Sequence, residues 1–202
     1  MTSAEFKIAF ETRFYAATTV NGLGWSNDEI SEFLNYGQNT LVSAMVESGN
    51  LEAISNLVKL VNLAAPLETN GEFRFNPAIN DLYVLIDAEL VVSGNNYPME
   101  KIGVEAISAF KVTPYNTAIF RQPKIAIDNS LGLDTPTFVV LKGTYIVGTP
   151  SALNYRYVVK PTAIDIDTPT ETNLNIVLHD KIVDIAVQKA VETYIKTGQS
   201  TQ

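Results

Sequence analysis

The sequence predicts an α+β protein in which a helical bundle is interrupted by a β-rich insertion. Near both ends of the 202-residue chain, apolar residues recur every three or four positions, the period of a helix that buries one face. From about residue 70 they alternate with polar residues, the period of a half-buried strand. We therefore expect residues 1–66 and 178–202 to form a bundle of three N-terminal helices and one C-terminal helix. Residues 67–177 should form an inserted, antiparallel β-rich domain, a sandwich or a small barrel.

Three amphipathic segments occupy the first third of the chain. The first follows Ser3 as a cap and ends before the Asn21–Gly24 breaker, and the second opens with Ser26 and Glu29, the S-x-x-E capping box. The third is closed by Pro66. Their apolar faces are Phe6, Phe10, Phe14 and Ala17 in the first; Ile30, Phe33, Leu34, Gly37, Leu41, Ala44 and Met45 in the second; and Ile54, Leu57, Val58 and Val61 in the third.

Strict alternation marks the strands of the middle region. We expect one strand over Leu82–Val92 and a hairpin whose two arms are joined at Gly148–Ser151. Residues 101–113 suit a strand slightly better than a short helix, and residues 114–136 suit an irregular loop with at most an edge strand. The inward residues are Leu82, Val84, Ile86, Ala88, Leu90 and Val92 in the first strand, and Val139, Leu141, Tyr145, Val147, Leu153, Tyr155, Tyr157 and Val159 in the hairpin.

A final helix begins near Leu178 and His179 and ends at Gly198. It is apolar over more than half of its circumference, so we expect it to lie between other elements, with the N-terminal helices as its partners.

Composition limits the chemistry. The chain has no cysteine and one histidine, and its formal net charge is -8 with a pI near 4.6. Thiolate chemistry and Cys-ligated metals are therefore excluded, and the acidic field disfavours nonspecific binding to nucleic acid. The charged residues among the first fifteen break up a secretory signal, and no apolar run is long enough to span a membrane, so we expect a protein with no membrane partner.

The side chains that might carry chemistry have simpler structural explanations. His179 lies at the start of a helix, where a polar side chain can satisfy open backbone groups. The pairs Asp165/Asp167 and Asp87/Glu89 are typical of solvated strand faces, and the Gly22–Gly24 segment of a turn between helices. We predict no catalytic residue, no cofactor and no metal site.

Five stretches carry a resemblance to a known family. They are Glu5–Phe6 with the aromatic stripe that follows, Ser26–Ile30 with Phe33–Asn35, Arg121–Pro123, Tyr157–Pro161, and Leu178–Val183 with Ala186–Val187. Together with the order of the elements, they resemble the neck or head-to-tail connector (portal adaptor) proteins of tailed bacteriophages, specifically those of the crAss-like podoviruses.

The resemblance implies a structural virion protein that is assembled in the host bacterial cytoplasm. It implies a ring of about twelve copies that joins the portal protein to other neck or tail proteins, while DNA passes through the centre without sequence-specific binding. An acidic wall suits such a channel because like charges repel. The residues that we expect at interfaces are Arg121, Pro123, Lys124, Tyr157, Lys160, Pro161, Thr197 and Gln202.

An alternative of another class is a non-catalytic, β-rich module that binds a peptide or a glycan. Its aromatic surface would be formed by Tyr145, Tyr155 and Tyr157. An enzyme is the least favoured class, because any Ser/His/Asp arrangement must use His179 and no G-x-S-x-G segment supplies a nucleophile.

Overall fold

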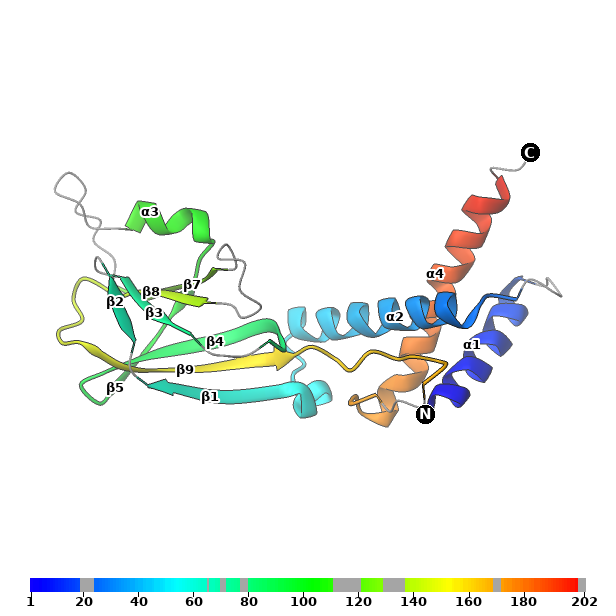
Figure 1. Ribbon diagram of the computed structural model, residues 1–202, viewed down its shortest axis with the longest axis horizontal. Helices are drawn as coiled ribbons and strands as arrows, with labels where there is room; N and C mark the ends of the chain where they lie inside the picture. Colours follow the sequence, from blue (N-terminus) through cyan, green and yellow to red (C-terminus); the bar gives the residue numbers. More distant parts are fainter. Residues whose placement is uncertain are drawn as a thin grey trace. The chain divides into compact units, whose positions relative to one another are not determined.

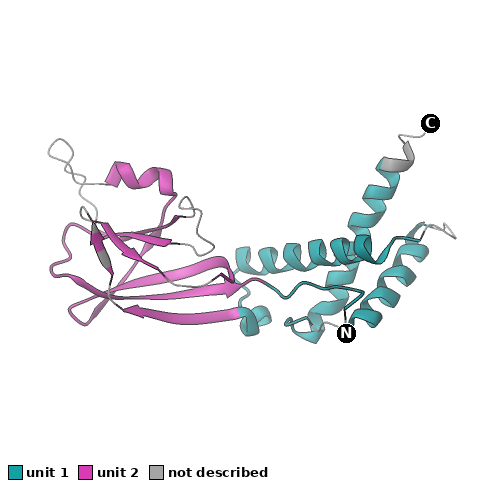
Figure 2. Cartoon of the chain, in the orientation of Figure 1, with its two compact units in different colours: residues 1–57, 161–202 teal, residues 58–160 magenta. Residues whose placement is uncertain are grey.

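The computed structural model describes residues 1–18, 24–64, 66–69, 72–76, 80–110, 121–128, 137–168 and 172–199, and within them the protein is α+β (Figure 1). Its contacts divide the chain into two compact units (Figure 2). Unit 1 is Met1–Leu57 with Pro161–Gln202, and unit 2 is Val58–Lys160. The sequence had suggested boundaries near residues 66 and 178, so the β-rich unit begins and ends earlier than expected.

Unit 1 contains the long helices. They are α1 (Ser3–Thr18), α2 (Asn27–Glu47) and α4 (His179–Gln199), with the short 3-10 helices η1 (Glu52–Leu57) and η3 (Ile176–Leu178). The capping box of α2 is confirmed, because the Ser26 hydroxyl accepts from the Glu29 amide and the Glu29 carboxylate accepts from the Ser26 amide at 2.8 Å. Phe6, Phe10 and Phe14 are buried as predicted. Ala17 is exposed, because the stripe turns away from the core in the last turn of α1.

The helix α4 packs against both α1 and α2, as its wide apolar face predicts. It approaches α2 closely at Gly37, where an added Cβ would lie 2.5 Å from the carbonyl oxygen of Ile182 and 3.2 Å from the amide nitrogen of Ala186. Glycine is therefore required because the two backbones meet without an intervening side chain. The fully buried core residues of α4 are Ile182, Val183, Ala186 and Ala190.

The predicted third N-terminal helix is wrong. Only η1 is helical, and strand β1 (Val58–Ala64) follows directly, antiparallel to β9 (Pro150–Val159) with Val58 opposite Val158. Branched Val58 and Val61 favour a strand over a helix, and this long-range pairing decides between the two conformations.

The segment Pro161–Thr168, which lies outside the helices and strands and ends in a turn at residues 166–168, runs along α2 and is called the strap below. It has no strand partner among the described residues, and polar side chains of α2 take that role instead. Asn35 donates to the carbonyl oxygen of Ile164 at 2.8 Å and accepts from the amide of Ile164 at 2.9 Å, so one side chain satisfies both backbone groups. Ile164 itself is buried.

Neighbouring side chains on the same face of α2 continue this pattern. Gln38 donates to the Thr162 carbonyl at 2.8 Å, Ser31 accepts from the Ile166 amide at 3.0 Å, and Asn27 donates to the Asp167 carboxylate at 2.5 Å. From Ser31 to Asn35 the helix advances four residues, about 6 Å, while the strap advances two residues from Ile166 to Ile164, about 6.6 Å when extended, so this step nearly matches. This match allows a helix face to bind an extended chain.

Unit 2 contains two sheets. The four-stranded sheet has the order β1-β9-β4-β5, and the five-stranded sheet has the order β2-β3-β8-β7-β6. Between the sheets, the ring of Phe138 from β8 packs edge-on against Tyr155 of β9, with centroids 4.8 Å apart. The strands not yet bounded are β2 (Leu67–Thr69), β3 (Glu72–Phe75), β4 (Leu82–Val92), β5 (Asn95–Pro98), β6 (Glu100–Lys101), β7 (Lys124–Asp128) and β8 (Thr137–Leu141).

The strand β4 has the bounds that the sequence predicted. The prediction of which side chains are buried is confirmed only from Ala88 onward. In the first half Leu85 is buried, whereas Val84 and Ile86 are half-buried. A register shift between Leu85 and Asp87 inserts one residue against β9. Because side chains alternate with period two, this bulge moves the buried set to the other parity.

The predicted hairpin is also wrong, although both of its strands exist. Strand β8 belongs to the five-stranded sheet and β9 to the four-stranded sheet, so residues 142–149 cross from one sheet to the other. Tyr145 and Val147 lie in this crossover and are exposed. Alternation indicated the strands but not their partners.

The structure also differs from the sequence predictions for residues 101–113 and 114–136. Residues 124–128 form β7, which pairs with β8 on one side and β6 on the other, and is therefore an inner strand and not an edge strand. The segment 101–113 is mainly helical where it is described, with η2 (Val104–Ala106) and α3 (Ile107–Phe110) after the end of β6. Residues 111–120 and 129–136 lie outside the described residues.

The contact at Gly37 leads to a stability prediction. Gly37→Ala should lower the free energy of unfolding by about 1–3 kcal/mol, because overpacking against backbone outweighs the gain of about 1 kcal/mol in helix propensity. Urea unfolding followed by circular dichroism measures this. Gly24→Ala is the control for adding a methyl group without a steric contact, since an added Cβ there meets nothing within 4 Å, although Gly24 lies outside the helices. Equal or greater stability of the Gly37 variant would contradict the contact.

Candidate subunit interface

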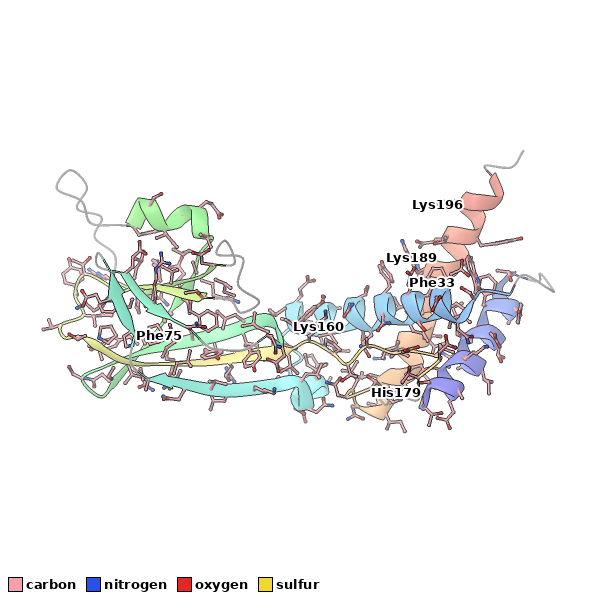
Figure 3. The ribbon with its side chains drawn as sticks, viewed as in Figure 1. Phe33, Phe75, Lys160, His179, Lys189 and Lys196 are labelled. Carbon is pink, nitrogen blue, oxygen red and sulfur yellow. The ribbon has the colours of Figure 1, made fainter. Side chains whose placement is uncertain are left out.

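The residues expected at interfaces differ in exposure. Arg121 and Lys160 are exposed (Figure 3 labels Lys160), Thr197 lies in the last turn of α4, and Gln202 is outside the described residues. The other four are buried inside the chain and offer little surface to a partner. They are Pro123, Lys124, Tyr157 and Pro161.

Lys124 is used within unit 2. Its side chain forms an ion pair with Glu100, and its ammonium lies 5.2 Å from the centroid of the Phe110 ring. A lysine that is 7 % exposed needs such partners, because an unpaired buried charge is costly. Its role is therefore to attach β7 to β6 and α3.

Tyr157 also points inward. Its hydroxyl donates to Asp81 at 3.0 Å, and burial raises the pKa of Tyr157 to about 12. The Lys59 ammonium lies 2.8 Å from the other oxygen of Asp81 and lowers the pKa of that carboxyl. Tyr155 is equally buried, and burial raises its pKa to about 12. The aromatic surface expected of Tyr145, Tyr155 and Tyr157 is therefore wrong, since only Tyr145 faces solvent.

His179 is a structural residue at the base of α4 (Figure 3). Its Nε2 lies 3.2 Å from the carbonyl oxygen of Leu174, its Nδ1 lies 2.6 Å from the amino group of Met1, and its ring packs against Phe6 at 5.1 Å. It satisfies a backbone group, as expected, although the group is a carbonyl before the helix and not an amide within it. Burial lowers the pKa of His179.

The acidic pairs have internal partners. Asp87 binds the Arg156 guanidinium with both oxygens, and Glu89 accepts from Asn96 at 2.9 Å. Asp165 accepts from the amide of Asp167 at 2.9 Å, so this pair lies in a turn and not on the strand face that was expected. In the described ranges, no group of three or more His, Asp or Glu side chains is placed to hold a metal ion.

Exposed apolar side chains are the feature of unit 1 that these internal contacts do not explain. Ile176 and Val177 are neighbours on η3 and are 70 % and 69 % exposed. Single exposed apolar residues are ordinary, whereas an adjacent pair on a short, ordered turn is more informative. We call Ile176 and Val177 the apolar pair.

Unit 1 also has an open groove of about 280 Å³ between α2 and α4. The Lys189 ammonium lies 5.1 Å from the centroid of the Tyr36 ring at this groove (Figure 3 labels Lys189), and Tyr36 is 46 % exposed. The groove combines an aromatic wall with charges of both signs. It is lined by Tyr36, Thr40, Ile185, Gln188, Lys189 and Glu192.

The features that sequence reasoning missed are this groove and the apolar pair. Val177 falls on the exposed side of the period of the last helix, with Lys181 and Asp184, and this could have marked it as outward-facing, whereas Ile176 is in phase with the buried His179 and Val183 and had no such signal. The groove has no comparable signal, because it depends on how closely α2 and α4 approach each other.

Comparison with protein-family models and with curated proteins found no match to this chain. Among the helices that the structure describes, none combines the length and apolar content needed to cross a membrane.

Burial of His179 leads to a prediction about pH. The unfolded side chain titrates near 6.5, and the folded pKa is lower, so the unfolded state binds more protons between the two values. Stability should therefore fall as pH is lowered from 7 to 5.5, by at most about 1.4 kcal/mol per pH unit. The carboxyls with lowered pKa values, such as Glu5 and Asp165, act below about pH 4.5 and do not enter this window.

The measurement is the urea midpoint at several pH values. His179→Gln keeps a donor for Leu174 but does not titrate, so its midpoint should vary less over this range. A variant with the same pH dependence as the parent protein would show that His179 is not the source of the effect.

Proposed function

We propose that this chain is a structural subunit of a tailed-phage neck, which forms a ring that connects the portal to the tail and surrounds the DNA passage. The setting in a phage particle rests on the sequence resemblance. The observation that supports assembly is the exposed apolar pair, Ile176 and Val177, on the ordered turn before α4. Such a pair gains free energy when a partner covers it.

The charge of the chain suits this proposal. A formal net charge of -8 keeps separate subunits soluble and repels a DNA backbone that moves past them. Three buried polar side chains, Lys124, Tyr157 and His179, are used for pairing inside the chain. These features favour a structural role, in which the exposed apolar pair on η3 contacts another molecule.

The proposal includes a finer view of each unit. We take unit 1 as a small bundle in which α4 lies between α1 and α2, and unit 2 as a sandwich with Phe138 and Tyr155 between its sheets. A cryo-EM map that resolves side chains would test this arrangement, and a closed barrel in unit 2 would refute it.

A β-rich binding module is the weaker candidate. The outer face of the four-stranded sheet has a hollow of about 180 Å³ beside Asp87, Glu89 and Asn154, which is smaller than the roughly 300 Å³ of ordinary ligand pockets. A glycan or peptide that raises the melting temperature through this hollow would favour the module over the scaffold.

Native mass spectrometry is the direct test of assembly. The purified chain, alone or mixed with portal rings, should give closed oligomers with a single dominant copy number near twelve. If the chain is instead a binding module, it should remain a monomer in this experiment, alone and with portal rings. A chain that stays monomeric at all concentrations and does not bind portal rings would refute the ring.

A further inference from the structure

The strap runs along α2 and is attached to it mainly through backbone groups (Figure 1). Polar side chains of α2 bind the strap backbone at Thr162, Ile164 and Ile166. Asp167 adds a side-chain contact, since its carboxylate accepts from the amide group of Asn27. The strap is therefore held by a row of hydrogen bonds on one side of a helix.

Little apolar surface supports these hydrogen bonds. Ile164 is 3 % exposed and Pro161 is buried as well, whereas Ile166 is half-buried and Thr162 and Ala163 are exposed. The helices α2 and α4, by contrast, bury apolar side chains over several turns. A segment opens locally at low cost in free energy when few apolar contacts hold it and its hydrogen bonds are near solvent. The strap meets this condition and the helices do not.

The α2 side chains that hold the strap also have partners outside it. The Asn35 amide group donates to the Ser31 carbonyl at 2.8 Å, and the Ser31 hydroxyl donates to the Asn27 carbonyl at 2.8 Å. Both acceptors lie four residues earlier in the same helix and remain when the strap is absent. Gln38 accepts from the Thr172 hydroxyl at 2.9 Å, beyond the end of the strap. Detachment therefore leaves each of these three side chains with a hydrogen bond, and α2 loses little stability.

The chain is fixed on either side of the strap by separate contacts. Before it, the Lys160 amide donates to the Asp81 carbonyl at 2.7 Å. After it, the Leu174 amide donates to the Thr172 hydroxyl at 3.3 Å, and Leu174 is buried. Neither contact involves the strap, so the strap can leave α2 while the flanking residues stay in place.

The strap also makes hydrogen bonds with segments other than α2. The Thr162 amide donates to the Asn173 side chain at 3.1 Å, and the Ser3 hydroxyl donates to the Thr168 carbonyl at 3.1 Å. Thr162 and Thr168 are both exposed, so water can replace these partners at small cost. These bonds therefore add little to the stability of the docked strap.

We propose that the strap is a latch, which detaches from α2 and docks again as one unit while α1, α2 and α4 stay folded. In the docked state, Asn35 and Gln38 hold the chain that leaves β9 against α2. In the open state, this chain is a free tether, and the polar side of α2 that carries Ser31, Asn35 and Gln38 is uncovered. The latch belongs to unit 1 and does not depend on the proposed ring.

Hydrogen exchange measured by NMR on the whole chain tests the latch. The amides of Ile164 and Ile166 are the reporters, because side chains of α2 accept from both. They should exchange more slowly than in an unstructured chain but at least about tenfold faster than the amides of Val42 in α2 and Ala186 in α4. Their exchange rates should also depend little on urea, since local opening exposes little surface.

The variant Asn35→Ala tests whether the strap opens as one unit. It removes both bonds to Ile164, so exchange at Ile164 should become about tenfold faster or more. Exchange at Ile166 should accelerate equally, although its amide is bound by Ser31, while Val42 and Ala186 should not change. Thr40→Ala is the matched control, because Thr40 is an exposed residue of α2 beside the groove and its loss should affect neither reporter.

Each other outcome overturns the latch. If Ile164 and Ile166 exchange at the rate and urea dependence of Val42 and Ala186, the strap leaves only when unit 1 unfolds. If they exchange as in an unstructured chain, the strap is not docked. Acceleration of Ile164 alone in Asn35→Ala would show that the hydrogen bonds open separately.

A second variant covers the case in which Asn35→Ala does not fold. Ser31→Ala removes the acceptor for the Ile166 amide and leaves both bonds between Asn35 and Ile164. A latch predicts faster exchange at Ile164 in this variant, with the helix amides unchanged. Unchanged exchange at Ile164 would count against it.

Discussion

The close approach of α2 and α4 at Gly37 is the constraint on which unit 1 depends. An absent side chain lets the α2 backbone lie against Ile182 and Ala186, which joins the first part of the chain to its last helix. The same approach gives α2 two different neighbours. Amide side chains before and after Gly37 bind the strap, while Tyr36 and Thr40 line the groove beside α4. The missing side chain at Gly37 therefore affects both the core of the unit and the open groove beside α4.

Helices that bury one face over several turns could be predicted from the local sequence alone. The aromatic stripe of α1, the Ser26 cap of α2 and the apolar face of α4 are each contained in one segment, so their period could be interpreted without knowing the fold. The strand β1 could not be recognised in this way. Its partner β9 lies about a hundred residues later, and branched residues at helical spacing looked the same as the continuation of a helix.

The burial of four of the expected interface residues was missed for a related reason. Lysine and tyrosine were taken as contact residues, yet both have long apolar portions that suit a core when a partner for the polar end is close. Glu100 supplies this partner for Lys124, and Asp81 supplies it for Tyr157. Neither partner is adjacent in sequence, so burial could not be inferred from residue type. The apolar pair was missed for the opposite reason, because aliphatic residues beside a helix start are assumed to be buried.

The two exposed aliphatic side chains are too small a surface to hold two molecules together by themselves. Full burial of Ile176 and Val177 is worth about 3–6 kcal/mol before the cost of association. Association costs at least about 4 kcal/mol, so little or no net binding free energy remains for this pair alone. The assembly that we propose therefore needs contact surface beyond the pair, or the high effective concentration that closure of a ring gives to its last contact.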